Sequence, residues 1–289
     1  MTNKFSPIVQ GCMGWGAWGA KLTTQQMAKQ INQAVELGIT TFDHADIYGD
    51  YTTEADFGKA LKASGIKREQ LQLISKCGIQ YVGSTRNNTI KHYQYDADYI
   101  VWSAERSLRD LGVSYLDLFL LHRPSPLMQA DEIARAVDKL RSEGKIRSFG
   151  VSNFTPWQTD LIRLKVPVEA NQIEFSLTAH QAMWDGSLDH MQINGIRPMA
   201  WSPLGSFFGQ DSPQAQRISK SLTALSKKYG ATSDQLLLAW ILKHPAGILP
   251  VIGTSSVERM KLASQAPGIQ LKDTDWFELL VASQGHKVA

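Results

Sequence analysis

Eight short apolar runs alternate with amphipathic segments along this chain, and this alternation restricts the possible folds more than any other feature. Apolar side chains recur at helical spacing in four segments, within Met27–Val35, Ile100–Leu111, Ile133–Leu140 and Ile218–Leu225. The eight runs have the character of buried strands, and they are Ile8–Val9, Thr40–Phe42, Leu71–Ile74, Leu116–Leu121, Ile146–Val151, Val168–Ile173, Pro198–Trp201 and Ile248–Ile252. Strands that alternate with helices pair in parallel, and eight of them favour closure of the sheet. The sequence therefore predicts an α/β fold, a (β/α)8 TIM barrel.

A single domain accounts for the length of the chain. A barrel of this type needs about 250 residues, and the 289 residues contain no proline-rich or glycine-serine linker that would divide them. We therefore expect residues 1–289 to form one domain, and we expect a monomer.

Two connections are longer than the others, at residues 77–98 and 202–213. Long polar loops on a compact barrel are commonly lids or binding loops.

Charge and cysteine content exclude several classes of function. The net charge is only +3, and the basic residues are scattered, so the chain lacks the electrostatic footprint of a nucleic-acid-binding protein. The longest apolar run, Leu236–Leu242, is far shorter than the roughly 20 residues that cross a bilayer, and no secretory segment follows Met1. Cys12 and Cys77 form no Cys-x-x-Cys pair. These features predict a cytoplasmic protein without a membrane segment, a disulfide framework or a thiolate metal site.

A glycine motif near the N-terminus has two interpretations. Gly14–Gly19 matches the G-x-G-x-x-G pattern of dinucleotide-binding Rossmann domains. Trp15 and Trp18 would obstruct the close approach of a pyrophosphate, however, and no tyrosine is followed by lysine four residues later, as in one large group of Rossmann reductases. We favour a glycine-rich barrel loop in which Trp15 lines the mouth of a pocket. Gly14 and Trp15 are counted among the cofactor-binding candidates.

Ionisable side chains directly follow three consecutive strand candidates. Asp43, Lys76 and His122 end the second, third and fourth strands, and Tyr48 comes five residues after Asp43. Chemistry in a barrel takes place at the carboxyl ends of the strands, where these side chains would meet. Each residue alone has a structural explanation, such as a helix cap, a snorkelling lysine or a satisfied core histidine. The four together favour an active site.

The segment from Asp43 to Gly49, with the sequence Asp-His-Ala-Asp-Ile-Tyr-Gly, resembles the Asp-x-Ala-x-x-Tyr-Gly segment of aldo-keto reductases. Lys76 and His122 fall where that family carries its other two catalytic residues. The resemblance extends over residues 8–263, and its further matches are Ser152-Asn153, Asn171-Gln172, Trp201-Ser202-Pro203-Leu204, Pro250–Ser256 and Arg259.

This resemblance implies a barrel enzyme that reduces a small carbonyl compound by direct hydride transfer from NADPH, without a metal. Tyr48 would be the general acid, although an unperturbed phenol has a pKa near 10. The charge of Lys76 would lower that pKa, and Asp43 would hold the lysine in an ion pair. His122 would orient the carbonyl oxygen. The catalytic candidates are therefore Asp43, Tyr48, Lys76 and His122.

The resemblance also implies a cofactor site. Ser152, Asn153 and Gln172 would bind the nicotinamide carboxamide. Trp201 would stack on the nicotinamide ring. Ser202 and Leu204 would offer backbone groups to the pyrophosphate. Arg259 would bind the 2'-phosphate that distinguishes NADPH from NADH, since a guanidinium forks onto phosphate oxygens. Gly253, Thr254 and Ser255 complete the set. NADH is the less favoured alternative, because Gly253 stands where some members carry lysine.

Arg123 follows His122, where many members carry tryptophan. It would either attract an anionic substrate or pair with a loop carboxylate, and the second role is favoured. The Arg123–Pro126 stretch also resembles channel-associated family members that bind NADPH and act as redox-sensing partners, but the retained His122 favours catalysis. A metal-dependent barrel hydrolase is disfavoured, because clustered His and Asp ligands are missing at the strand ends.

Overall fold

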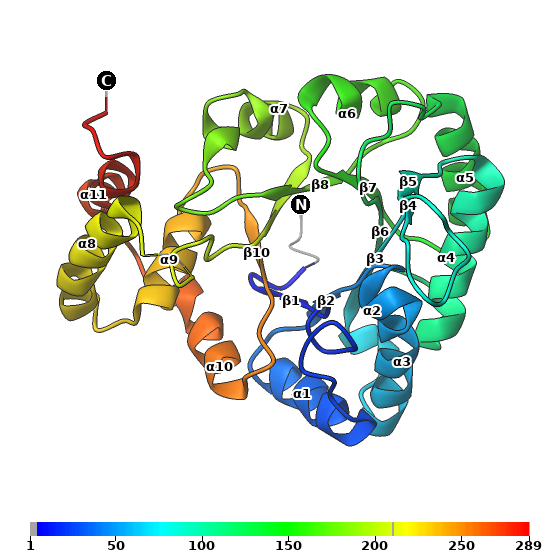
Figure 1. The fold of residues 1–289 in the computed structure, drawn as a ribbon, viewed down its shortest axis with the longest axis horizontal. Helices are drawn as coiled ribbons and strands as arrows, with labels where there is room; N and C mark the ends of the chain where they lie inside the picture. The colour runs from blue at the N-terminus through cyan, green and yellow to red at the C-terminus, as the bar shows by residue number, and fades with distance from the viewer. Residues whose placement is uncertain (1–4, 210, 289) are drawn as a thin grey trace.

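The computed structural model describes residues 5–209 and 211–288, and eight parallel strands form a closed barrel at its centre (Figure 1). Neighbours around the barrel follow the order β1-β10-β9-β8-β7-β6-β3-β2. The predicted (β/α)8 TIM barrel is therefore confirmed. The barrel strands are β1 Val9–Gly11, β2 Thr41–Asp43, β3 Gln72–Cys77, β6 Leu118–Leu121, β7 Phe149–Ser152, β8 Ala170–Glu174, β9 Arg197–Trp201 and β10 Leu249–Ile252.

Helices connect successive strands and cover the outside of the barrel (Figure 1). They are α1 Thr24–Glu36, α2 Tyr48–Tyr51, α3 Thr53–Ser64, α4 Ala97–Leu111, α5 Ala130–Ser142, α6 Pro156–Arg163, α7 Ser187–Ile193, α8 Pro213–Tyr229, α9 Ser233–Leu242, α10 Val257–Gln265 and α11 Asp273–Gln284. Local sequence sets several helix ends. Thr23 and Gln26 form a capping box at the start of α1, and Gly112 ends α4 in the left-handed conformation.

Two apolar layers result from the alternation of side chains along the strands. One face of each strand points into the barrel and the other faces the helices. The interior layer is small and is made of Val9, Ile74, Leu118, Leu120, Ala170, Met199, Leu249 and Val251. The larger layer lies between strands and helices and includes Phe42, Leu73, Phe119 and Phe149. The barrel is thus a packed core, and polar side chains that follow the inward-facing residues are carried to its end.

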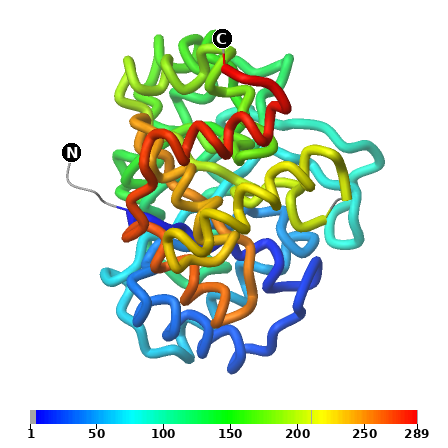
Figure 2. Tube along the Cα trace, turned by 90° about the vertical axis from the view of Figure 1, so that its left-hand side faces the viewer, coloured from blue at the N-terminus to red at the C-terminus, as the bar shows by residue number. Residues whose placement is uncertain are grey.

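The C-terminal segment forms helix α11, which lies beside α8 on the outside of the barrel (Figure 2). Trp240 of α9 and Trp276 of α11 stack with their ring centroids 4.8 Å apart. Each indole nitrogen donates to the backbone carbonyl of the other tryptophan, at 3.2 and 2.9 Å. This packing fixes α11 against α9.

The long connection after β3 contains a small hairpin that the sequence did not predict. Strands β4 Ile79–Gln80 and β5 His92–Tyr93 pair in antiparallel orientation within it. Each has only two residues, which is too short for a periodic pattern to be recognised.

Within residues 5–209 and 211–288, none of the helices combines the length and the apolar character that a bilayer-spanning segment requires.

Candidate active site

Strand alternation directs three of the four predicted catalytic side chains into one end of the barrel. Lys76 lies two residues after Ile74, an interior residue of β3, and His122 lies two residues after Leu120, an interior residue of β6. Residues two apart on a strand share a face. Asp43 ends β2 and pairs in register with Ile74. The carboxyl ends of β2, β3 and β6 thus bring Asp43, Lys76 and His122 to the same region.

The ammonium group of Lys76 is the centre of this region. Its Nζ donates to Asp43 Oδ2 at 2.7 Å, to the carbonyl oxygen of His44 at 2.8 Å and to Tyr48 Oη at 3.0 Å. Lys76 is fully buried, so water cannot replace any of these acceptors. Three acceptors use all three protons of the ammonium. The phenolic oxygen of Tyr48 therefore accepts a hydrogen bond and keeps its own proton free for donation.

Burial and charge act in opposite directions on Tyr48. Burial raises the pKa of the Tyr48 phenol above its ordinary value, while the neighbouring Lys76 charge lowers it, and the net pKa is raised. The sequence led us to expect a lowered pKa, but the desolvation of the phenol outweighs the lysine charge. Burial also disfavours the charged form of Lys76, but Asp43 and Tyr48 outweigh this effect, so the pKa of Lys76 is raised. At neutral pH the pair is a protonated phenol and an ammonium.

His122 lies beside Tyr48, with the two ring centroids 6.0 Å apart and the ring planes at 78°. Burial holds the pKa of His122 well below its usual range, and the positive charges of Lys76, Arg123 and Lys91 lower it further. The imidazole is therefore neutral at physiological pH, with one donor and one acceptor nitrogen. Its Nδ1 is buried without a hydrogen-bond partner among the described residues. A group of the protein thus remains unsatisfied next to the phenol.

A chain of hydrogen bonds connects Asp43 to the ends of three further strands. Gln172 Nε2 donates to Asp43 Oδ1 at 2.9 Å, and Ser152 Oγ donates to the carbonyl oxygen of Gln172 at 2.9 Å. Asn153 Nδ2 donates to Ser152 Oγ at 2.8 Å, and Trp201 Nε1 donates to Asn153 Oδ1 at 3.0 Å. The residues expected to bind nicotinamide therefore lie together, and Gln172 connects them to the carboxylate that holds Lys76. None of these mutual bonds was predicted from the sequence.

A cavity of about 260 Å³ begins after β9 and extends to helix α10. Five of the predicted cofactor residues line it, namely Ser202, Leu204, Gly253, Thr254 and Arg259; its other lining residues are Pro203, Gly205, Asp234, Leu238, Ile252 and Ala263. A Cβ built on Gly253 meets no atom within 4 Å, so this side of the cavity is open. The first turn of α10 carries Arg259, whose own backbone N–H is capped by Ser256 Oγ at 3.4 Å, and the N-terminal end of the helix faces this region with its partial positive charge. These features fit a phosphate-bearing cofactor.

Trp15 and Ser255, two further predicted cofactor residues, do not line this cavity. Trp15 does not line a pocket mouth, because its side chain is fully buried against Phe42 and Phe57, with ring centroids 6.1 and 6.3 Å away. Its indole nitrogen donates to the carbonyl oxygen of Thr254 at 3.0 Å, so Trp15 supports the backbone of a residue that lines the cavity. The carbonyl oxygen of Ser255 accepts from Gln30 of α1, and Ser255 is not a lining residue.

Close packing accounts for the glycine motif. A Cβ on Gly19 would lie 2.2 Å from the carbonyl oxygen of Gly14, and a Cβ on Gly16 would lie 2.4 Å from Thr53 Oγ1. Gly14 itself lies against the carbonyl oxygen of Gly253, at 3.6 Å from a built Cβ. The motif therefore forms a tight loop after β1, and the Rossmann interpretation is wrong.

Trp18 of the same loop is an aromatic residue of the site that the sequence reasoning missed. Its ring centroid lies 6.5 Å from that of Tyr48 and 5.2 Å from that of Tyr81. Trp18 remains 39% exposed, so it forms the rim of the site rather than its floor. The sequence shows that Trp15 and Trp18 belong to the same loop. Only the packing of the folded chain decides which of the two is buried.

The chain after Tyr48 is held in an unusual conformation by the loop that follows β3. Gly49, Asp50 and Tyr51 have φ angles of 62°, 58° and 66°, so three consecutive residues are left-handed. The carboxylate of Asp50 accepts from the backbone and side-chain donors of Ser84 and Thr85, at 2.7–3.2 Å. These contacts connect the long loop to the residues that position Tyr48, and the sequence reasoning missed them.

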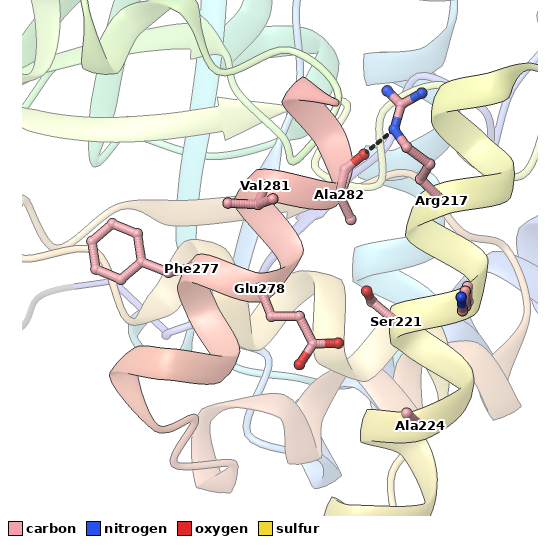
Figure 3. A pocket seen from close by; sticks show the side chains of 8 residues that line it. Arg217, Ser221, Ala224, Phe277, Glu278, Val281 and Ala282 are labelled. Carbon is pink, nitrogen blue, oxygen red and sulfur yellow. Dashed lines mark hydrogen bonds between the residues drawn. The ribbon is translucent and has the colours of Figure 1, made fainter. Parts of the chain in front are cut away.

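A second cavity, of about 550 Å³, lies in the groove between α8 and α11 (Figure 3). Arg217 crosses it and donates to the carbonyl oxygen of Ala282 at 2.9 Å (Figure 3). None of the predicted site residues lines this groove. In the described part of the chain, no group of three or more His, Cys, Asp and Glu side chains is arranged to hold a metal ion.

Comparison with known proteins gives a consistent assignment. The chain is 40% identical over 289 residues to oxidoreductase YdhF of Escherichia coli, covering 99% of this chain and 96% of that protein. It is 38% identical over 288 residues to a 6-dehydroglucose reductase of Agrobacterium fabrum, covering 95% of each. The crystal structure of the thermostable aldo-keto reductase Tm1743 with the inhibitor epalrestat superposes with a TM-score of 0.82, at 27% identity over 97% of both chains. The sequence model of the Aldo/keto reductase family matches residues 7–280, and the chain belongs to this family.

Proposed function

We propose that this protein reduces aldehydes or ketones to alcohols with NADPH, and that Tyr48 is the proton donor. The observation that carries the proposal is the Lys76 ammonium, which is saturated by Asp43, the His44 carbonyl and Tyr48. A phenol that accepts from an ammonium has its proton available for a carbonyl oxygen, and the positive charge stabilises the phenolate that remains. Bound NADPH would supply the hydride.

The side chains around Tyr48 have separate tasks in this proposal. His122, as a neutral imidazole, hydrogen-bonds the carbonyl oxygen and directs it toward the phenol. Asp43 keeps Lys76 charged, and Gln172 fixes the second carboxylate oxygen of Asp43. Burial of all these groups excludes water, which strengthens the electrostatic contacts that the reaction uses.

The cofactor would extend from the nicotinamide-binding residues at the ends of β7, β8 and β9 into the cavity beside α10. Arg259 is exposed in the first turn of α10, where it would engage the 2'-phosphate together with the backbone N–H groups of that turn. Asp234 lines the same cavity, and its negative charge opposes the phosphate that Arg259 attracts. We propose NADPH as the preferred cofactor and NADH as a weaker one.

The names of two relatives support a carbonyl on a sugar-like skeleton as one substrate. The Agrobacterium fabrum protein and a second relative, from Novosphingobium aromaticivorans, are both 6-dehydroglucose reductases, at 38% and 33% identity. Aromatic residues at the rim, Trp18 and Tyr81, offer flat surfaces against which a sugar ring would pack. We also propose that the protein is a monomer and that it is located in the cytoplasm. Light scattering after gel filtration tests the oligomeric state.

The experiment is a spectrophotometric assay of NADPH consumption with aldehydes, diketones, sugar aldehydes and steroid-like ketones, with and without a metal chelator. We expect multiple turnovers with at least one class, unchanged by the chelator. A single turnover of bound NADPH without further cycles would instead favour a redox-sensing role. Activity that the chelator abolishes would favour the metal-dependent alternative.

A further inference from the structure

Arg123 is a positively charged side chain beside the proposed active site. The Arg123 backbone is fixed on both sides by Tyr95, because its N–H donates to Tyr95 Oη at 3.2 Å and its carbonyl accepts from Tyr95 Oη at 2.6 Å. The guanidinium carbon lies 5.4 Å from the centroid of the Trp201 ring. Arg123 therefore extends from the end of β6 toward the end of β9, along the same rim as His122.

The guanidinium of Arg123 has donors to spare. Within residues 5–209 and 211–288, no carboxylate lies within 4 Å of it and no acceptor takes a hydrogen bond from it. Pairing with a loop carboxylate, which the sequence favoured, is therefore not found. Other arginines of this protein do have such partners: Arg68 pairs with Asp117 at 2.6 Å and Arg141 pairs with Glu169 at 3.0 Å.

A second cation, Lys91, is close enough to act on the same histidine. Lys91 belongs to the loop that follows β3, and its side chain is exposed. The charges of Arg123 and Lys91 both act on His122 and favour its neutral form. No carboxylate of the described residues lies within 4 Å of the Lys91 ammonium. Among the described residues, Arg123 and Lys91 are thus two cations without a carboxylate partner whose charges act on His122, in a region that already contains the Lys76 ammonium.

We propose that Arg123, assisted by Lys91, binds an anionic group of the carbonyl substrate, a carboxylate or a phosphate. This inference rests on the proposed carbonyl reduction and specifies its substrate class. A half-buried guanidinium beside an indole ring has several N–H groups, and two of them can bind two oxygens of an oxyanion at once. Lys91 would contribute as an exposed point charge that attracts anions toward His122 and Arg123.

The test compares matched pairs of substrates that differ in charge. Succinic semialdehyde is compared with its methyl ester, and glyceraldehyde 3-phosphate with glyceraldehyde, so the two pairs also distinguish a carboxylate from a phosphate. The measured quantity is the ratio of kcat/KM for the charged substrate to kcat/KM for the neutral one. We expect the wild-type protein to prefer the charged member of at least one pair, and this preference to weaken as salt is added.

Three variants separate the roles of the cations. Arg123→Gln should lower the ratio by about tenfold or more, as expected for the loss of charge-assisted hydrogen bonds. Lys91→Gln should lower it by about two- to fivefold, since an exposed charge is screened. Lys139→Gln, at an exposed position on α5 with no ion pair among the described residues, should leave it unchanged. Inhibition by succinate, compared with succinamide, gives a binding readout that does not depend on turnover.

Several outcomes would overturn the inference. If the wild-type protein does not distinguish charged from neutral substrates, or if Arg123→Gln lowers both rates equally and succinate inhibits no better than succinamide, no anion site exists. Turnover of the neutral aldehydes in these experiments means that the proposed carbonyl reduction still holds. If neither member of either pair is reduced by the wild-type protein or by Lys139→Gln, the proposed function itself fails.

Discussion

The Nζ of Lys76 donates a hydrogen bond to the phenolic oxygen of Tyr48 across 3.0 Å, and both groups are buried. An ammonium in contact with a phenol favours loss of the phenolic proton, while burial opposes it. The raised pKa of Tyr48 means that the proton stays on the phenol until a carbonyl oxygen takes it.

Replacing Tyr48 by phenylalanine should remove the proton donor and leave the ring in place. We expect kcat to fall by about 100-fold or more, the usual scale of general acid catalysis. The affinity for NADPH, measured by quenching of tryptophan fluorescence, should not change. A Tyr48→Phe variant that reduces a good aldehyde at the parental rate would show that another group donates the proton.

The buried pair of Lys76 and Asp43 should be costly to break from one side. Lys76→Met leaves the carboxylate of Asp43 without its cation, and we expect the free energy of unfolding to fall by about 3 to 5 kcal/mol. In the double variant Asp43→Asn/Lys76→Met, the loss should be smaller than the sum of the two single losses, because neither charge then remains unpaired. Urea denaturation measures all three values, and strict additivity would argue against the pairing.

Arg259 should determine the preference between the two nicotinamide cofactors. Arg259→Ala should weaken NADPH by about tenfold or more and NADH by much less, because only NADPH carries the 2'-phosphate. Lys261→Ala is the matched control, since Lys261 is an exposed cation on the same helix that does not line the cavity. Dissociation constants from fluorescence titration provide the measurement, and equal losses for both cofactors would contradict a phosphate contact.

Glu54 should make stability depend on pH. Its carboxylate accepts from Ser75 Oγ at 2.6 Å and from Ser107 Oγ at 2.9 Å, but burial outweighs these bonds and raises the pKa to about 7. The folded state therefore holds a proton that the unfolded state releases, and the free energy of unfolding should fall as the pH rises from about 4.5 to about 7. The cost above this window is about 3 kcal/mol.

Glu54→Gln tests the sign of this effect. The variant should be as stable as the wild-type protein at the acidic end of the window and more stable at its alkaline end, as measured by urea denaturation at a series of pH values. Glu36→Gln, at an exposed position on α1, serves as control and should show no such difference. A Glu54→Gln variant that loses stability at alkaline pH would mean that the carboxylate is favourably ionised in the folded protein.

Asp50 should fix the loop that follows β3. Asp50→Ala removes the acceptor of Ser84 and Thr85 and places alanine at a left-handed position, so hydrogen exchange around residues 84 and 85 should become about tenfold faster or more. Asp50→Asn is the control, because asparagine keeps one side-chain oxygen and tolerates this conformation. Equal exchange rates in the two variants would mean that other contacts hold the loop.

Much of the site could be predicted because it depends on local patterns. Asp43, Lys76 and His122 each follow an apolar strand candidate, and this pattern predicted that they meet at the carboxyl end of the barrel. Contacts between distant segments could not be predicted in the same way. Gln172 and Asp43 are separated by 129 positions, and no short-range pattern predicts that their side chains meet.

The sequence by itself determined the eightfold alternation of strands and helices, the barrel that follows from it, and the identity of the polar residues at its carboxyl end. Only the tertiary structure decided which groups are desolvated and which charges face one another. Burial rather than Lys76 therefore sets the direction of the Tyr48 pKa, and packing buries Trp15 while Trp18 reaches the rim. The physical reason is that strand periodicity is encoded within a few residues, whereas solvation and charge pairing depend on every segment that packs around a side chain.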